Sequence, residues 1–268
     1  MLDRLGTEEL VVRFARKFPS DTSYTQLCEA MAQGDAETAF RAAHTLKGLC
    51  LNLGFESLYK VDAALTEELR RAMGVAAIKA VRAVDYKNAG TIEFLLDTTG
   101  KFYFMEMNTR VQVEHPVSEQ ITGADIIKEQ LRIAAGEPMS CADRAPFTPF
   151  GHAMEFRINA EDPDHGFRPC PGKITRFEPP MGPGVRVETY VHEGSSISPY
   201  YDSMVAKVIV SGQDREECLA RGRRALDEFK IEGIATTLPF HRRVLDNEVF
   251  RAGEATTDFI ETQMGDLL

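Results

Sequence analysis

Hydrophobic residues recur every three to four positions through the first seventy residues, and no strand pattern interrupts them. Asp35 is a suitable N-cap, and Gly54 stands where the helix that follows Asp35 would end. The helical patterns cover about residues 8–17, 24–33, 36–53 and 56–72. Four short helices with brief loops predict an antiparallel bundle over residues 1–63, whose last helix runs to about residue 72.

From about Gly74 the pattern changes to β-rich runs. TIEFLLD and KFYFMEM flank Thr99-Gly100 and predict a hairpin. A helix is predicted over residues 124–136, and two amphipathic stretches, 215–229 and 238–247, close the chain. Further strands are predicted over residues 152–160, 173–179, 184–191 and 204–212. The order of elements indicates an α+β chain in which a helical bundle precedes the strands.

Composition narrows the class of protein. The net charge of −10 and the acidic isoelectric point argue against a nucleic-acid or membrane-surface binder. No apolar run approaches the roughly 18 residues of a membrane span, and the N-terminus has neither the apolar core nor the cleavage site of a signal peptide. The five cysteines form no CxxC pair, which indicates free thiols in a reducing cytoplasm and no structural zinc.

Candidate chemistry begins with the stretch FMEMNTRVQVEH, residues 104–115. Its polar residues fall on alternate positions, so that a single extended strand would present them all on one face. This row combines two carboxylates, two amides and a guanidinium, and it lacks the lysines that are usual on a solvated strand. The row consists of Glu106, Asn108, Arg110, Gln112 and Glu114. Strand geometry is not expected to continue through His115-Pro116, so the row need not be one flat face.

A second candidate lies on the third predicted helix. His44, Lys47 and Gly48 are spaced at i, i+3 and i+4 and share the outer face. An imidazole beside an ammonium can hold a phosphoryl group, and a glycine there leaves room for a partner. A lone histidine is more often an ordinary surface residue. The glycine argues against that alternative, because glycine inside a helix costs about 1 kcal/mol.

Residues 5–70 resemble a histidine phosphotransfer (HPt) domain, through AAHTLKG, the closing LNLG and the flanking helices. The resemblance implies that His44 is a phosphoacceptor served by response-regulator receiver domains, with Lys47 as phosphate support. No kinase ATP site accompanies the motif, so this part would act as a passive relay.

Residues 64–260 resemble the C-terminal half of biotin carboxylase, the ATP-grasp subunit of acetyl-CoA carboxylase and related enzymes. The resemblance rests on dense strings such as FYFMEMNTRVQVEHPVSEQITGADIIKEQLRIAAGE, EFRINAEDP, PCPGKITRFEPP and SPYYDSMVAKVIV. It implies a partial ATP-grasp segment at residues 64–138 and a C-terminal α+β domain at residues 139–268. The implied activity is that of a ligase: ATP- and bicarbonate-dependent carboxylation of biotin on a carrier protein, for fatty-acid synthesis.

The resemblance makes Glu93, Glu106 and Asn108 the ligands of Mg²⁺ or Mn²⁺ that bridge nucleotide phosphates. Hard divalent cations take carboxylate and amide oxygens, which suits this assignment. Glu93 and Glu106 each lie six residues from the Thr99-Gly100 turn, so the hairpin should bring them side by side.

The remaining site roles also follow from the resemblance. Arg110, whose guanidinium fork suits a small planar anion, would bind bicarbonate together with Gln112 and the Val113 backbone. Glu114 would be the general base that takes the bicarbonate proton, and Arg157 would stabilise the negative oxygen of the biotin enolate.

Asp202 in PYYDSM is a further candidate, as a supporting partner of the site. Taken singly, Glu93 would be an ordinary acid at a strand edge and Arg157 an ordinary salt-bridge partner. Their positions inside the long matched strings favour the carboxylase interpretation.

The N-terminal domain, ATP-contacting lysines and glycine-rich lid of a biotin carboxylase have no counterpart before residue 64. We therefore expect an incomplete ATP pocket and no activity unless another chain supplies the missing half. ALTEELR, residues 64–70, fits both the last helix of an HPt bundle and the helix that opens the carboxylase segment. The resemblance implies a biotin carboxyl carrier protein and a second copy of this chain as partners. Self-association into a dimer or a larger species is also expected because a truncated sheet would expose apolar edges.

Overall fold

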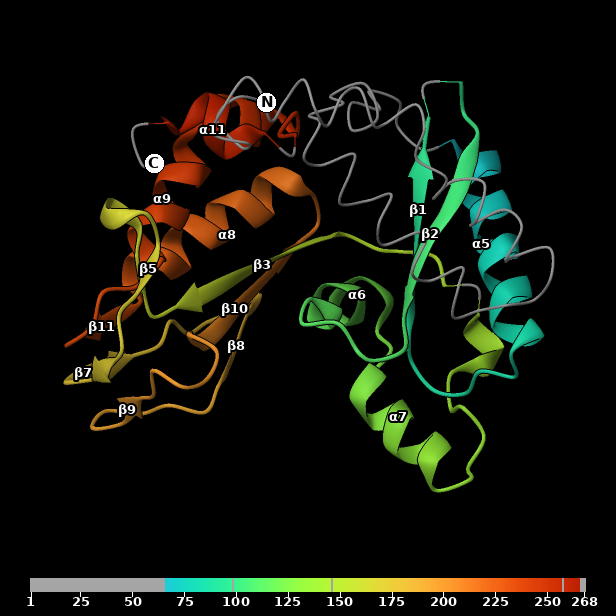
Figure 1. Cartoon of the computed structure of the whole chain (residues 1–268), viewed down its shortest axis with the longest axis horizontal. Helices are drawn as coiled ribbons and strands as arrows, with labels where there is room; N and C mark the ends of the chain where they lie inside the picture. Colours follow the sequence, from blue (N-terminus) through green and yellow to red (C-terminus); the bar gives the residue numbers. More distant parts are fainter. Residues whose placement is uncertain (1–65, 98, 146, 257, 266–268) are drawn as a thin grey trace, which may run out of the picture. The chain divides into compact units, whose positions relative to one another are not determined.

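A computed structural model describes residues 66–97, 99–145, 147–256 and 258–265 (Figure 1). The chain divides into two compact units, residues 1–112 and 113–268, and each is described by itself. The bundle predicted over residues 1–63 lies outside the described residues, together with His44 and Lys47. The described part has a mixed α/β fold, as the strand and helix patterns predicted.

The first unit opens with helix α5, Glu67–Ala83. Thr66 caps it, since its Oγ1 accepts a hydrogen bond from the Leu69 N–H at 3.2 Å. The helix does not end near residue 72 but continues through Gly74, so the change of pattern predicted at Gly74 comes too early. The alanine-rich sequence after Gly74 favours helix, and no atom crowds the position where a Cβ at Gly74 would lie.

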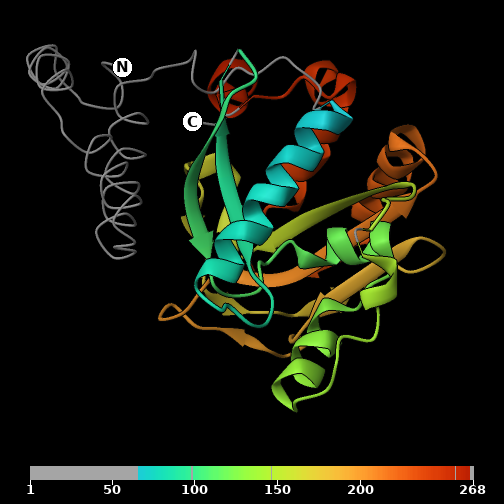
Figure 2. The same ribbon diagram turned by 90° about the vertical axis from the view of Figure 1, so that its right-hand side faces the viewer.

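Strands β1, Thr91–Leu96, and β2, Phe102–Asn108, form the predicted antiparallel hairpin. Asp97 fixes the turn, because its Oδ1 accepts from the N–H groups of Thr99 at 2.8 Å and Lys101 at 2.9 Å. Glu93 pairs directly with Glu106, and a bulge follows at Glu93/Phe94. The prediction that the hairpin brings these two carboxylates together is confirmed. Helix α5 lies beside the hairpin in both views (Figures 1 and 2).

The second unit is built on an antiparallel sheet of three strands in the order β3-β10-β8. The strands are β3, His152–Asn159, β10, Met204–Gly212, and β8, Val185–Thr189, all of them at predicted positions. One face of the sheet is apolar and packs on helix α8, Arg215–Glu228. Phe156, Val208 and Leu226 are buried there, in the main core of the unit.

The other face of the sheet is charged and contacts helix α6, His115–Thr122. This helix was not predicted, because it is short and its sequence carries little apolar periodicity. Pro116 in its first turn and Gly123 in the left-handed conformation at its end define it locally. Helix α7, Ile126–Ala134, confirms the helix predicted over residues 124–136 and is capped by Asp125.

Smaller elements complete the second unit. The segment predicted as one strand over residues 173–179 is divided between β6, Gly172–Lys173, and β7, Arg176–Glu178. The predicted helix at residues 238–247 is present as α9, Leu238–Asp246. The paired strands are β4, Glu161–Asp162, with β5, Arg168–Pro169; β6, Gly172–Lys173, with β9, Ser196–Ile197; and β7, Arg176–Glu178, with β11, Lys230–Glu232. The helices are η3, Ala142–Arg144; η4, Pro163–His165; α9, Leu238–Asp246; α10, Glu248–Ala252; and α11, Phe259–Gln263. In the part of the chain that the structure describes, no helix has the length and hydrophobicity needed to cross a membrane.

Two glycines inside helices give opposite expectations for the same substitution. A Cβ at Gly222, buried in α8, would lie 2.9 Å from Phe156 Cζ, so we expect Gly222→Ala to lower the free energy of unfolding by about 1–3 kcal/mol. A Cβ at Gly74 would meet no atom within 4 Å, so Gly74→Ala should stabilise α5 by about 0.5–1 kcal/mol. Urea unfolding followed by circular dichroism measures both. Equal effects would contradict the packing of α8 on β3.

Candidate active site

Two carboxylates converge on one amide at the open end of the β1–β2 hairpin. Asn108 Nδ2 donates to Glu93 Oε1 at 3.0 Å and lies 3.4 Å from Glu106 Oε1. Like charges placed directly across a strand pair repel each other, and here the Asn108 amide contacts both carboxylates. Two carboxylates and an amide oxygen fit a hard divalent cation. Among the described residues no three His, Cys, Asp or Glu side chains converge, so the other ligands of such an ion would come from a bound phosphate or water.

The alternating row does not continue as a strand beyond Asn108, where β2 ends. Arg110 lies in the loop that follows, and its Nη1 donates to Gln112 Oε1 at 2.9 Å and to the Val111 carbonyl at 3.2 Å. Its Nη2 lies 3.5 Å from Asn108 Oδ1. Arg110 is exposed. The guanidinium therefore links the carboxylate pair to Gln112 and remains accessible to an anion.

In the second unit, Glu114 is the N-cap residue of α6, but its carboxylate does not cap the helix. It accepts a hydrogen bond from Arg157 Nη2 on β3 at 2.7 Å instead. Both side chains are about half exposed, at 53% and 50%. The predicted base and the predicted enolate-stabilising guanidinium are thus in direct contact, although 43 residues separate them in the chain.

Lys207 on β10 was not predicted as a functional residue. Its Nζ donates to the Val113 carbonyl at 3.1 Å and pairs with Glu188 Oε2 at 2.5 Å. Its side chain is only 11% exposed. Lys207 therefore fixes the backbone immediately before Glu114. The available signal in the sequence was a single lysine within the apolar run MVAKVIV.

Glu155 on β3 was also missed. Its side chain is 4% exposed, and neither carboxylate oxygen has a hydrogen-bond partner. Arg157 Nε lies 3.7 Å from its Oε1. Burial raises the pKa of Glu155 to about 7, because the charges of Lys207 and Arg157 offset only part of the cost of desolvation. Glu155 is thus a buried acid that titrates near neutral pH.

Asp202 holds its own turn, since its Oδ1 accepts from the Met204 N–H at 2.8 Å. Its support of the site stays a prediction. The structure brings the predicted residues together in two groups, one in each unit. The first group is Glu93, Glu106, Asn108, Arg110 and Gln112, and the second is Val113, Glu114 and Arg157.

Three family models match the chain. Residues 155–262 match the biotin carboxylase C-terminal domain, and residues 62–142 match the ATP binding domain of the carbamoyl-phosphate synthase L chain. Residues 20–85 match the Hpt domain. The Hpt match and the ATP-binding match overlap over residues 62–85, which include α5.

Curated relatives agree with the first two of these matches. Biotin carboxylase 1 of Bacillus subtilis is 53% identical over 201 residues, and the biotin carboxylase of Nostoc sp. is 52% identical over 199 residues. Each alignment covers 74% of this chain and 44% of the relative. The chain therefore spans less than half the length of these relatives.

A solved structure gives the same result. The biotin carboxylase domain dimer of Hydrogenobacter thermophilus 2-oxoglutarate carboxylase, in complex with MgADP, ADP and bicarbonate, superimposes with a TM-score of 0.72 at 43% identity. The match covers 78% of this chain and 46% of that chain.

From about residue 62 the chain is therefore similar to biotin carboxylases over the C-terminal part of their length. The chain joins this part to a segment that matches the Hpt domain.

The raised pKa of Glu155 predicts a pH dependence of stability. Its ordinary value, 4.5, applies to the unfolded chain, and the folded value is about 7. Between these values the folded state holds the proton more strongly, so the free energy of unfolding should fall as pH rises from 4.5 to 7, by up to about 3 kcal/mol. Glu155→Gln should remove this slope in urea unfolding at pH 5 and pH 8. The control Glu178→Gln, exposed on β7, should keep it. A slope that survives Glu155→Gln would contradict the assignment.

Proposed function

We propose that residues from about 64 onward supply the metal-, bicarbonate- and base-bearing half of a biotin carboxylase. The reaction is the ATP- and bicarbonate-dependent carboxylation of biotin on a carrier protein. The observation that carries the proposal is the 2.7 Å contact between Glu114 and Arg157, which sets a carboxylate and a guanidinium together beside a backbone held by Lys207. A base and an anion-stabilising group are two of the functions that this reaction requires of side chains.

Glu93, Glu106 and Asn108 would hold Mg²⁺ or Mn²⁺. The carboxylate oxygens of Glu93 and Glu106 both lie within hydrogen-bond distance of Asn108 Nδ2, and Asn108 would turn its amide oxygen toward the ion. A cation would also relieve the repulsion between the two carboxylates. When bound, the ion would neutralise the phosphate charge of ATP. The chain's own contribution is to align two acidic side chains on paired strands before the ion arrives.

Bicarbonate would bind to Arg110, whose fork is exposed and already oriented by Gln112. The Val113 backbone, held by Lys207, would complete this anion site. Glu114 would take the bicarbonate proton, and Arg157 would then stabilise the negative oxygen that forms on biotin. Asp202 would support this group from the turn before β10.

The proposed organisation is an ATP-grasp segment at residues 64–138 followed by a carboxylase domain at residues 139–268. Several copies of the chain would associate, as two do in the Hydrogenobacter thermophilus domain, and a biotin carboxyl carrier protein would deliver the substrate. A reducing cytoplasm suits Cys141, Cys170 and Cys218, which are free thiols. The ATP pocket would be completed by an N-terminal half from another polypeptide.

Complementation tests this function. The full chain alone should release no ADP in a bicarbonate- and biotin-dependent reaction, because under this proposal it carries only half of the nucleotide pocket. Activity should arise when the separately expressed N-terminal half of the Bacillus subtilis relative is added, and Glu114→Gln should lower it by at least about 100-fold. The control Glu178→Gln should leave it unchanged. Activity of the chain alone, or activity that survives Glu114→Gln, would contradict the proposal.

A second candidate function rests on the Hpt match at residues 20–85. His44 would accept a phosphoryl group from a receiver domain, and Lys47 would offset its charge. Incubating the full chain with phosphorylated receiver domains should place an acid-labile phosphate on it. His44→Gln should abolish the label, whereas His165→Gln, which alters an exposed histidine of the second unit, should not. A label that persists in His44→Gln would rule this site out.

A further inference from the structure

The packing of the sheet does not explain why residue 155 is a glutamate. It faces Ile209 across the strand pair, and its buried oxygens accept no hydrogen bond. An apolar side chain would fill this position at lower cost, since burying an unsatisfied carboxylate is unfavourable. Such a residue calls for an explanation in terms of what its charge does.

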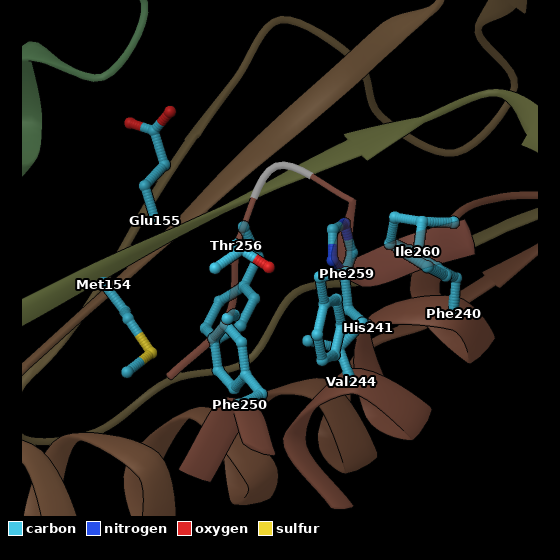
Figure 3. A pocket seen from close by; sticks show the side chains of 11 residues that line it. Met154, Glu155, Phe240, His241, Val244, Phe250, Thr256, Phe259 and Ile260 are labelled. Carbon is cyan, nitrogen blue, oxygen red and sulfur yellow. The ribbon is translucent and has the colours of Figure 1, made fainter. Parts of the chain in front are cut away.

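The apolar cavity behind β3 does not supply that explanation. This cavity, of about 290 Å³, is lined by phenylalanine rings and by His241, and Glu155 belongs to the lining. Figure 3 shows, however, that the Glu155 carboxylate lies on the opposite side of β3 from the rings. The charge is therefore directed to the face of the sheet that carries Arg157 and Lys207.

The charged groups around Glu155 come from four segments. They are Arg157 on its own strand, Lys207 on β10, Glu188 on β8 and Glu114 before α6. Lys207 is already engaged by Glu188 at 2.5 Å and by the Val113 carbonyl. Arg157 is therefore the cation that Glu155 and Glu114 share, with Glu114 at Nη2 and Glu155 nearest to Nε.

The backbone of Arg157 is fixed independently of these carboxylates. Its carbonyl accepts from Thr237 Oγ1 at 3.0 Å and from His241 Nε2 at 2.8 Å. Only the side chain is left to be oriented by charge. With two carboxylates on different edges of one guanidinium, loss of either charge leaves the other as the remaining counter-ion.

We propose that Glu155 is a positioning residue for Arg157, holding its guanidinium in place when Glu114 becomes protonated. This inference rests on the proposed function, in which Glu114 takes the proton of bicarbonate. That transfer neutralises Glu114 and removes the charge that holds Arg157 Nη2. Glu155 then keeps the guanidinium on β3, oriented toward the developing negative oxygen. Burial is the main cause of the raised pKa of Glu155, and the nearby charge of Glu114 adds to it; that added contribution disappears when Glu114 is neutralised.

The test uses the full chain without substrates, with the Nε–H of Arg157 observed by ¹⁵N NMR at pH 8 and assigned by its absence in Arg157→Lys. The signal should be resolved in the wild-type chain and in Glu114→Gln, because Glu155 alone suffices to hold the group. It should also remain in Glu155→Gln, where Glu114 is the remaining counter-ion, and disappear into exchange with water in the double variant Glu114→Gln/Glu155→Gln. The double variant Glu114→Gln/Glu188→Gln, which instead removes a neighbouring carboxylate paired with Lys207, is the matched control and should retain the signal.

A second measurement covers the case in which Glu155→Gln fails to fold. The ¹³C carboxyl signal of Glu155, assigned by its absence in Glu155→Asp, should titrate near pH 7 in the wild-type chain and at lower pH in Glu114→Gln. An Arg157 signal that is absent from the wild-type chain, lost in Glu114→Gln or retained in the double variant Glu114→Gln/Glu155→Gln would overturn the proposal. So would a titration midpoint that Glu114→Gln leaves unchanged. None of these readouts requires carboxylation, so a negative complementation assay would count against the proposed function alone.

Discussion

The charged face of the β3-β10-β8 sheet is the constraint on which the second unit depends. Four carboxylates and three cations meet there: Glu114, Glu119, Glu155 and Glu188 with Arg157, Arg186 and Lys207. Arg186 reaches Glu119 on α6 at 2.7 Å, and Arg157 reaches Glu114 at the start of the same helix. Partly buried charges of this kind must pair to be tolerated, so the pairing determines where α6 lies. Because carboxylates outnumber cations by one on this face, one carboxylate is incompletely paired, and it is the most buried one, Glu155.

Most of the helices and strands that were predicted correctly have a local sequence pattern of their own. The hairpin follows from two β-rich runs and a turn, and equal spacing from that turn sufficed to place Glu93 opposite Glu106. The capped helices α7 and α8 follow from apolar spacing and an aspartate at each start. Helix α6 was missed because it is held by contacts with the sheet, and not by its own periodicity.

Site residues that are close in the sequence could be predicted to lie together from local patterns. Site residues that are far apart in the sequence could be assigned only through family resemblance. Arg157 and Glu114 were each assigned a role through the resemblance. Their contact could not be predicted, because 43 residues separate them and no local sequence pattern encodes it. Lys207 is 94 residues from the carbonyl that it holds. Glu155 looks in the sequence like any acid in a strand. Its distinguishing property is burial, which arises only when β3, β10 and β8 pair and α6 packs on their charged face.

Helix α5 shows why two unrelated segments can be joined without local disruption. It falls within both the Hpt match and the ATP-binding match, and in the structure it contains no buried residue. Its determinants are local: the Thr66 cap, Glu67 and Glu68 in the first turn, and an alanine-rich body. A helix specified by its own sequence does not depend on which core it packs against. Such a helix satisfies the sequence pattern of either family, so both family models extend across it.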